Sequence, residues 1–178
     1  MGPYLNAINS SIKPVVGVVR GSAIGIGFTQ LSLYDFVFVD PDTTFISVFM
    51  KTFQSPEGSS TLNFPKLFGT RRANEILMLD STVTAQEALN CGFVSGILPE
   101  LKGEPDFFDL KKVPAIGKLL ATDYQTLTNC KLLLNKAKDN EAYEKSLKVE
   151  GEALLATWKD DEFKEKITKY LKAVAMQK

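Results

Sequence analysis

Residues 15–39, VVGVVRGSAIGIGFTQLSLYDFVFV, decide the fold that the sequence predicts. Residues 15–19 follow a proline and are β-branched apart from one glycine, which is typical of a strand buried on both faces. Residues 20–23 predict a turn, and apolar residues at helical spacing predict a helix over 24–34. A second strand is expected at 36–39. Because strand, helix and strand alternate, the stretch predicts an α/β fold.

The pattern changes in the second half of the chain. The expected elements after the first stretch are, in chain order, a strand at 44–46, a helix at 71–79, a short helix opened by a capping box at Thr84 and ended by Gly92, and a strand at 93–98. Residues 101–114 predict a surface loop, and only amphipathic helices follow. We therefore expect one domain, with an α/β core over 1–110 and a C-terminal helical region over 111–178.

Composition excludes several classes of function. The 178 residues carry 21 basic and 21 acidic side chains, so no overall charge favours binding to nucleic acid. The sequence has no histidine, which excludes His-based catalytic triads and removes the commonest zinc ligand. Cys91 and Cys130 lack metal-ligand spacing and fit a reducing compartment. For the same reasons we expect no metal site. No apolar run is long enough to span a membrane, so we also expect no membrane span.

Three glycines cluster where the first predicted strand gives way to the helix. Gly21, Gly25 and Gly27 match neither the dinucleotide-binding fingerprint nor the Walker phosphate-binding loop. A glycine-rich first helical turn lets a ligand approach unpaired backbone N–H groups, which favour negative charge. The alternative is that the glycines only permit a tight turn and close packing.

The second candidate feature is a carboxylate in a turn of small residues. Glu57 lies in the sequence Ser-Pro-Glu-Gly, with Phe53 and Leu62 nearby. If the turn folds inward, burial raises the pKa of Glu57 and suits it to proton transfer. The alternative is an ordinary exposed turn glutamate.

Two motifs resemble the crotonase (enoyl-CoA hydratase/isomerase) superfamily. Residues 12–40, IKPVVGVVRGSAIGIGFTQLSLYDFVFVD, are similar to its KP, hydrophobic run, NG-x-A-x-G-x-G segment, and residues 84–99, TAQEALNCGFVSGILP, to its (S/T)-A-x-E-A-x-x-x-G-(L/F)-V segment. Residues 49–77, with the turn QSPEGSS and a following FPK, resemble the peroxisomal or mitochondrial delta(3)-delta(2)-enoyl-CoA isomerase branch. The resemblance implies a crotonase-like spiral of short strands and helices followed by a C-terminal helical region.

The resemblance also implies catalytic roles. Glu57 corresponds to the base that moves a proton from carbon 2 to carbon 4 of a 3-enoyl-CoA, and the backbone N–H of Ile26 to one donor of the oxyanion hole. Gly25 and Gly27 would let the thioester approach that donor. The two glutamates of hydratases are replaced here by Thr29 and Phe49, which disfavours hydration.

A set of small and apolar residues is expected to bind the acyl thioester. It consists of Ala23, Gly25, Gly27, Phe28, Phe49, Phe53 and Leu62. The alternative for the large apolar members is plain core packing.

Further expectations concern the rest of the assembly. The second oxyanion donor of the family lies N-terminal to the glycine turn, in a part of the family domain that we expect this sequence to lack. No cofactor is expected, because CoA is part of the substrate. The resemblance implies an acyl-CoA partner, a homo-oligomer (trimer or hexamer) and a peroxisomal or mitochondrial location. The alternative function is a catalytically impaired crotonase-like module that binds acyl-CoA or a protein.

Overall fold

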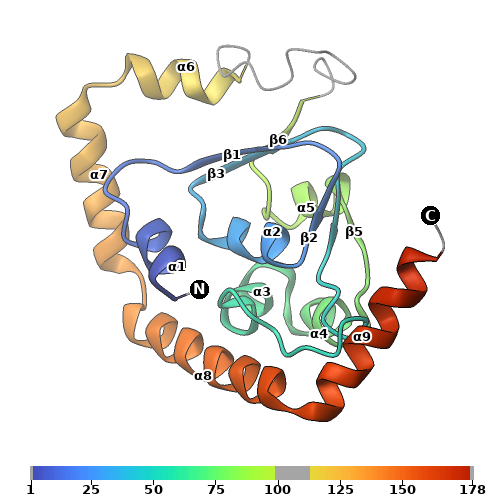
Figure 1. The fold of residues 1–178 in the computed structure, drawn as a ribbon. Helices are drawn as coiled ribbons and strands as arrows, with labels where there is room; N and C mark the ends of the chain where they lie inside the picture. The colour runs from blue at the N-terminus through green and yellow to red at the C-terminus, as the bar shows by residue number, and fades with distance from the viewer. Residues whose placement is uncertain (1, 99–112, 177–178) are drawn as a thin grey trace.

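Two small sheets form the α/β part of the computed structural model, which describes residues 2–98 and 113–176 (Figure 1). The first sheet contains the parallel strands β1 (Val16–Val19), β3 (Phe36–Val39) and β6 (Gly96–Ile97), in the order β1-β3-β6. The second contains β2 (Ser22–Ile24), β4 (Thr44–Ile46) and β5 (Val83–Thr84), with β4 parallel to β2 and antiparallel to β5. The α/β fold class predicted from the sequence is therefore confirmed.

Helices surround these sheets. In chain order they are α1 (Gly2–Asn9), α2 (Ile26–Thr29), the 3-10 helix η1 (Gln30–Leu33), α3 (Ser60–Phe68), α4 (Thr70–Leu79), α5 (Ala85–Asn90), α6 (Pro114–Ala121), α7 (Tyr124–Ala137), α8 (Asn140–Lys159) and α9 (Asp161–Ala175). Figure 1 shows α6 to α9 following one another around the outside of the α/β part. The predicted helical character of the C-terminal region is thus confirmed within the described residues.

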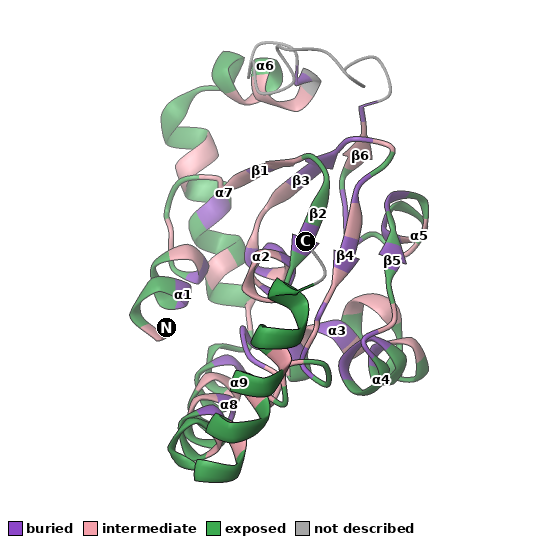
Figure 2. Ribbon diagram, turned by 45° about the vertical axis from the view of Figure 1, so that its right-hand side comes forward, coloured by how far each residue is buried: buried purple, intermediate pink, exposed green. Residues whose placement is uncertain are grey.

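The core lies between the sheets and helices α2 to α5, and aromatic rings dominate it. Phe28 has no exposed surface, and its ring centroid lies 4.8 Å from that of Phe64 and 5.2 Å from those of Phe45 and Phe93. Burying such large side chains supplies much of the favourable free energy of folding. Figure 2 shows the contrast with α9, which contains no buried residue.

Local structure differs from expectation around the glycine cluster. The predicted turn over 20–23 and the predicted start of the helix at Ile24 are wrong, because Ser22–Ile24 form strand β2 in register with Thr44–Ile46. Gly25 then takes a positive φ of 56°, and the helix begins only at Ile26. Pairing with a strand about twenty residues away overrides the local helical spacing.

Three further differences are smaller. The strand expected at 93–98 shrinks to Gly96–Ile97, because Phe93 and Val94 donate to the Ala88 carbonyl and close the end of α5. Helices α1 and α3 were not predicted. The predicted helix start at Thr84 is confirmed, since the Glu87 amide donates to Thr84 Oγ1 at 3.2 Å, but the capping box is only half formed, because the Glu87 carboxylate pairs with Arg72. The loop expected over 101–114 and the expected domain boundary near 110 fall almost wholly outside the described residues.

Candidate active site

The Glu57 side chain is buried at the point where the chain enters α3. Only 7% of it is exposed. The Thr29 hydroxyl, at the end of α2, donates to Glu57 Oε1 at 3.1 Å, while Oε2 has no hydrogen-bond partner among the described residues. The turn therefore folds inward and leaves one carboxylate oxygen available.

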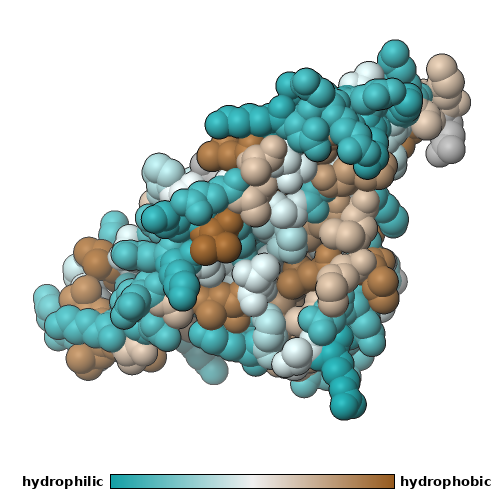
Figure 3. Space-filling model, turned by 90° about the horizontal axis from the view of Figure 1, so that it is seen from below, coloured by the Kyte–Doolittle hydropathy of each residue, from teal (hydrophilic) through white to brown (hydrophobic). Residues whose placement is uncertain are grey.

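Glu57 borders a small cavity lined mainly by apolar residues. The cavity has a volume of about 50 Å³, and Leu5 of α1 and Leu147 and Leu154 of α8 are among the residues that line it. Helix α8 runs along the lower edge of the molecule in Figure 1, and Figure 3 shows that the face seen from below carries mostly hydrophilic side chains with separate hydrophobic patches between them. Helices α1 and α8 thus separate the carboxylate from solvent.

The surroundings of Glu57 raise its pKa from 4.5 to about 7. Burial is the largest cause, since an apolar setting disfavours the charged form. The hydrogen bond from Thr29 lowers the pKa, and the negative charge of Glu150 raises it. A carboxylate that gains and loses a proton near neutral pH is suited to act as a general base and then as a general acid.

Gly58 explains how the Glu57 turn comes so close to α2. Its φ is +76°, and a Cβ atom at this position would lie 2.5 Å from Thr29 Oγ1 and 2.8 Å from Thr29 Cβ. The same Cβ position lies 3.6 Å from Ile26 Cδ1. A side chain at Gly58 would therefore force α2 and the turn apart.

The Ile26 amide lies on this adjacent helix. Ile26 is the first residue of α2, so its N–H has no acceptor within the helix. Gly25 before it has a positive φ, and a Cβ atom at Gly27 would meet no atom within 4 Å. The two glycines that flank Ile26 leave this end of the helix uncrowded. Gly25, Ile26 and Gly27 do not line the cavity beside Glu57, and their part in the site stays a prediction.

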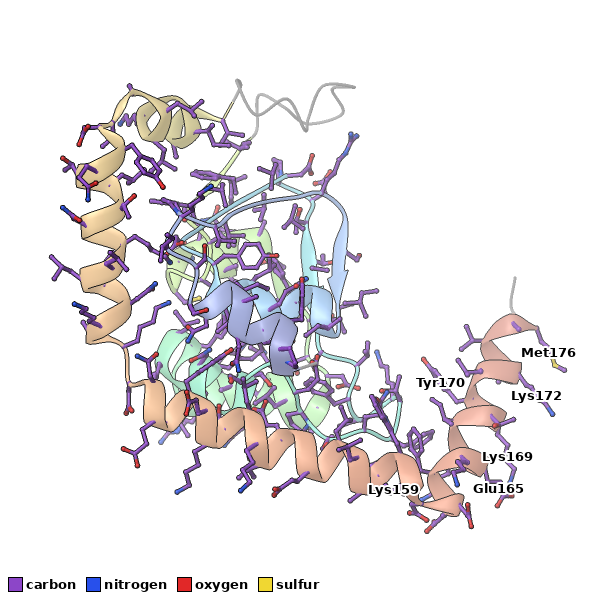
Figure 4. All side chains as sticks on the ribbon, turned by 60° about the vertical axis from the view of Figure 1, so that its left-hand side comes forward. Lys159, Glu165, Lys169, Tyr170, Lys172 and Met176 are labelled. Carbon is purple, nitrogen blue, oxygen red and sulfur yellow. The ribbon has the colours of Figure 1, made fainter. Side chains whose placement is uncertain are left out.

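The other predicted binding residues lie elsewhere. Ala23, Phe28 and Phe49 belong to the main core, and Leu62 packs against the cluster of Leu5, Leu33 and Tyr143. Phe53 is 42% exposed and its ring faces that of Tyr170, which Figure 4 labels on α9. None of these residues lines the cavity beside Glu57, and their part in substrate binding stays a prediction.

Two residues of the site escaped the sequence analysis. Thr29 was considered only as a position that lacks a hydratase glutamate, whereas its hydroxyl holds Glu57. Glu150 comes from α8 and contacts the start of α3 across 91 positions of sequence, so no local pattern could reveal it. The contacts of both residues form only when helices that are distant in sequence come together in the folded chain.

The raised pKa of Glu57 predicts a pH-dependent stability. The folded chain keeps the Glu57 proton up to about pH 7, whereas the unfolded chain releases it near pH 4.5. The contribution to stability is therefore fully present below pH 4.5 and is lost as pH rises through about 7, with a total of about 3 kcal/mol. Because the chain has no histidine, no side chain has an ordinary pKa between about 5.5 and 8.

Urea denaturation of the wild type and of Glu57→Gln at several pH values between 4 and 8.5 measures this effect. The wild type should lose free energy of unfolding across the range, and Glu57→Gln should lose about 3 kcal/mol less. Parallel curves for the two proteins would contradict the raised pKa.

The fold and the site together define a class of protein, a crotonase-like α/β domain with a buried glutamate in a turn. Comparison with known proteins agrees with this class. The chain matches the family model for enoyl-CoA hydratase/isomerase over residues 2–176, and it belongs to that family. It lies close to the isomerase branch of the crotonase superfamily.

Three relatives illustrate the likeness. The peroxisomal enoyl-CoA delta isomerase 3 of Mus musculus is 40% identical over 97 residues, 54% of this chain and 31% of that protein. The chromodomain Y-like protein of Rattus norvegicus is 30% identical over 169 residues, 94% of this chain and 28% of that protein. A solved enoyl-CoA hydratase/isomerase from Pseudoalteromonas atlantica T6c is 25% identical with a TM-score of 0.83, covering 96% of this chain and 66% of that one. The chain thus spans under a third of these two curated relatives.

The described residues contain neither a membrane-spanning helix nor a cluster of metal-ligating side chains. Within residues 2–98 and 113–176, none of the helices combines the length and the apolar content needed to cross a membrane. In the same ranges, no three His, Cys, Asp or Glu side chains gather into a group that could hold a metal ion.

Proposed function

We propose that this chain carries the catalytic base of an enoyl-CoA isomerase, which shifts the double bond of a 3-enoyl-CoA to the 2-trans position. The observation that carries the proposal is the buried Glu57 carboxylate, held through Oε1 by Thr29 and free at Oε2 beside an apolar cavity. The similarity to enoyl-CoA delta isomerases supports the choice of reaction.

The proposed reaction requires one base and no redox step. Glu57 removes a proton from carbon 2, the electron pair of that C–H bond forms the new C2=C3 bond through a dienolate, and the protonated Glu57 returns the proton to carbon 4. Since Thr29 occupies Oε1, Oε2 is the oxygen that takes the proton. The negative charge of the dienolate resides on the thioester oxygen, which the Ile26 N–H would stabilise. We assign only this one oxyanion donor to the described residues.

The cavity limits how the substrate can lie. A volume of about 50 Å³ holds roughly two water-sized groups, which is less than carbons 2 to 4 of the substrate require. The rest of the acyl chain and the CoA would lie outside it, so turnover requires α1 or α8 to shift. Consistent with the family resemblance, we further propose that the reaction needs no cofactor, that the protein forms a homo-oligomer and that it acts in peroxisomes or mitochondria.

A second function is a crotonase-like module that binds acyl-CoA or a protein without turnover. The small volume of the cavity favours it, as does the alignment of 94% of the chain with a protein named for its chromodomain rather than for an activity.

An assay and a titration separate the two functions. The protein is incubated with a 3-enoyl-CoA while the absorbance of the conjugated product is followed, and calorimetry measures binding of a saturated acyl-CoA. Turnover supports the isomerase, and binding without turnover supports the second function. If the protein neither turns over the 3-enoyl-CoA nor binds the acyl-CoA, both the isomerase and the acyl-CoA-binding module are contradicted.

A further inference from the structure

We propose that Glu150 is a positioning residue for Glu57, because its carboxylate holds the backbone that carries Glu57 into the site. The inference rests on the proposed role of Glu57. Glu150 lies on α8, is 6% exposed and lines the same cavity as Glu57.

The contacts of Glu150 are unusual in that they fix the N-terminus of another helix. Its Oε2 accepts a hydrogen bond from the Ser59 amide at 2.7 Å, and its Oε1 accepts from the Thr61 amide at 3.0 Å and the Thr61 hydroxyl at 2.5 Å. The amides at the start of a helix have no partner within it, and a carboxylate there is also favoured by the helix dipole.

The chain supplies no local substitute for this cap. Ser59, the N-cap residue of α3, has a φ of 57° and makes no side-chain capping bond to its own helix. Its hydroxyl pairs with Ser146 of α8 at 2.8 Å instead. Both anchors of the turn thus come from α8, which places the position of Glu57 under the control of that helix.

The hydrogen bonds of Glu150 and Glu57 indicate different roles for the two carboxylates. Glu150 accepts three hydrogen bonds, whereas Glu57 accepts one and keeps a free oxygen. The negative charge of Glu150 also raises the pKa of Glu57. Glu57 is therefore the group placed to exchange a proton, and Glu150 the group that holds it in place.

Hydrogen exchange and NMR test the inference without relying on turnover. In Glu150→Ala, the Ser59 and Thr61 amides should exchange at least about tenfold faster than in the wild type. In the isosteric Glu150→Gln, the 13C-detected titration of the Glu57 carboxyl should move to lower pH, because a neighbouring negative charge has been removed. In Glu150→Ala the Glu57 titration should move further down than in Glu150→Gln, because loss of the anchor also exposes Glu57 to water, and equal shifts in the two variants would indicate an effect of charge alone.

The matched control is Glu152→Gln. Glu152 lies on the same helix, and its side chain is 66% exposed. This variant should leave both the exchange of the two amides and the titration of Glu57 as in the wild type. If Glu150→Ala does not fold, Thr61→Val serves in its place, since it removes one of the three donors and keeps the shape of the side chain.

Kinetics extend the test where the chain turns over a 3-enoyl-CoA. Glu150→Gln should lower kcat by about 10- to 100-fold with little change in KM, because misplacing a catalytic group affects the chemical step. Absence of turnover in the wild type would contradict the isomerase proposal alone, and the NMR result would still decide the role of Glu150. Unchanged amide exchange together with an unchanged Glu57 titration in Glu150→Gln would overturn the inference.

Discussion

Replacing Glu57 with glutamine is expected to lower kcat for a 3-enoyl-CoA by about 10²- to 10⁴-fold. Glutamine has nearly the same shape and can still accept the hydrogen bond from Thr29, but it cannot take the proton from carbon 2. The variant should keep its fold, since the replaced group is already largely neutral below pH 7. Circular dichroism and thermal unfolding check the fold, and the absorbance of the conjugated product measures the rate.

Glu144→Gln provides the control for this prediction. Glu144 is an exposed glutamate of α8, so its replacement should leave the rate within about twofold of the wild type. A Glu57→Gln variant that is folded and as active as Glu144→Gln would remove Glu57 from the mechanism.

Replacing Gly58 with alanine is expected to destabilise the fold and to disturb the site together. Alanine at a φ of +76° is strained by about 1–2 kcal/mol. The new methyl group would also overlap Thr29, since the Cβ position lies 2.5 Å from its hydroxyl oxygen, and overpacking of this kind adds about 1–3 kcal/mol. Urea denaturation measures the total, and the activity should fall because the hydrogen bond from Thr29 to Glu57 is displaced.

Gly92→Ala separates the two causes. Gly92, which follows the last turn of α5, has a similar φ of +79°, but a Cβ atom there meets no atom within 4 Å. Its replacement should therefore cost only the strain of about 1–2 kcal/mol and leave activity intact. Equal losses of stability in the two variants would show that the contact between Gly58 and Thr29 does not matter.

Much of the fold could be predicted from residues 15–46, because its signals are local. Short apolar runs identify β1 and β3, and the hydrogen bond from the Glu87 amide to Thr84 Oγ1, three residues apart, marks the start of α5. The expected burial of the first strand on both faces is wrong, since Gly17 is the one buried residue of β1. Strand β2 could not be predicted in this way. Its residues are small or follow helical spacing, and they form a strand only because they pair with β4 in the folded chain.

The candidate site was predicted in part for the same reason. The glycines and the turn glutamate occur in short motifs, so Ile26 and Glu57 could be named, although burial of the turn was only one of two interpretations. The features that decide between them are long-range: Thr29 approaches only because Gly58 lacks a side chain, and Glu150 arrives on a helix from the far end of the chain. Phe28 and Phe49, two of the predicted acyl-binding residues, lie in the main core, and hydrophobicity alone does not distinguish a core residue from a pocket residue.

The most direct test of the central claim follows the proton that Glu57 is proposed to move. Wild-type protein is given a 3-enoyl-CoA carrying deuterium at both positions of carbon 2, and the rate and the position of the label in the product are measured. A base at Glu57 predicts slower turnover than with the unlabelled substrate, deuterium at carbon 4 of the product, and loss of the reaction in Glu57→Gln. Turnover with neither an isotope effect nor label at carbon 4, and equally fast in Glu57→Gln, would contradict the claim.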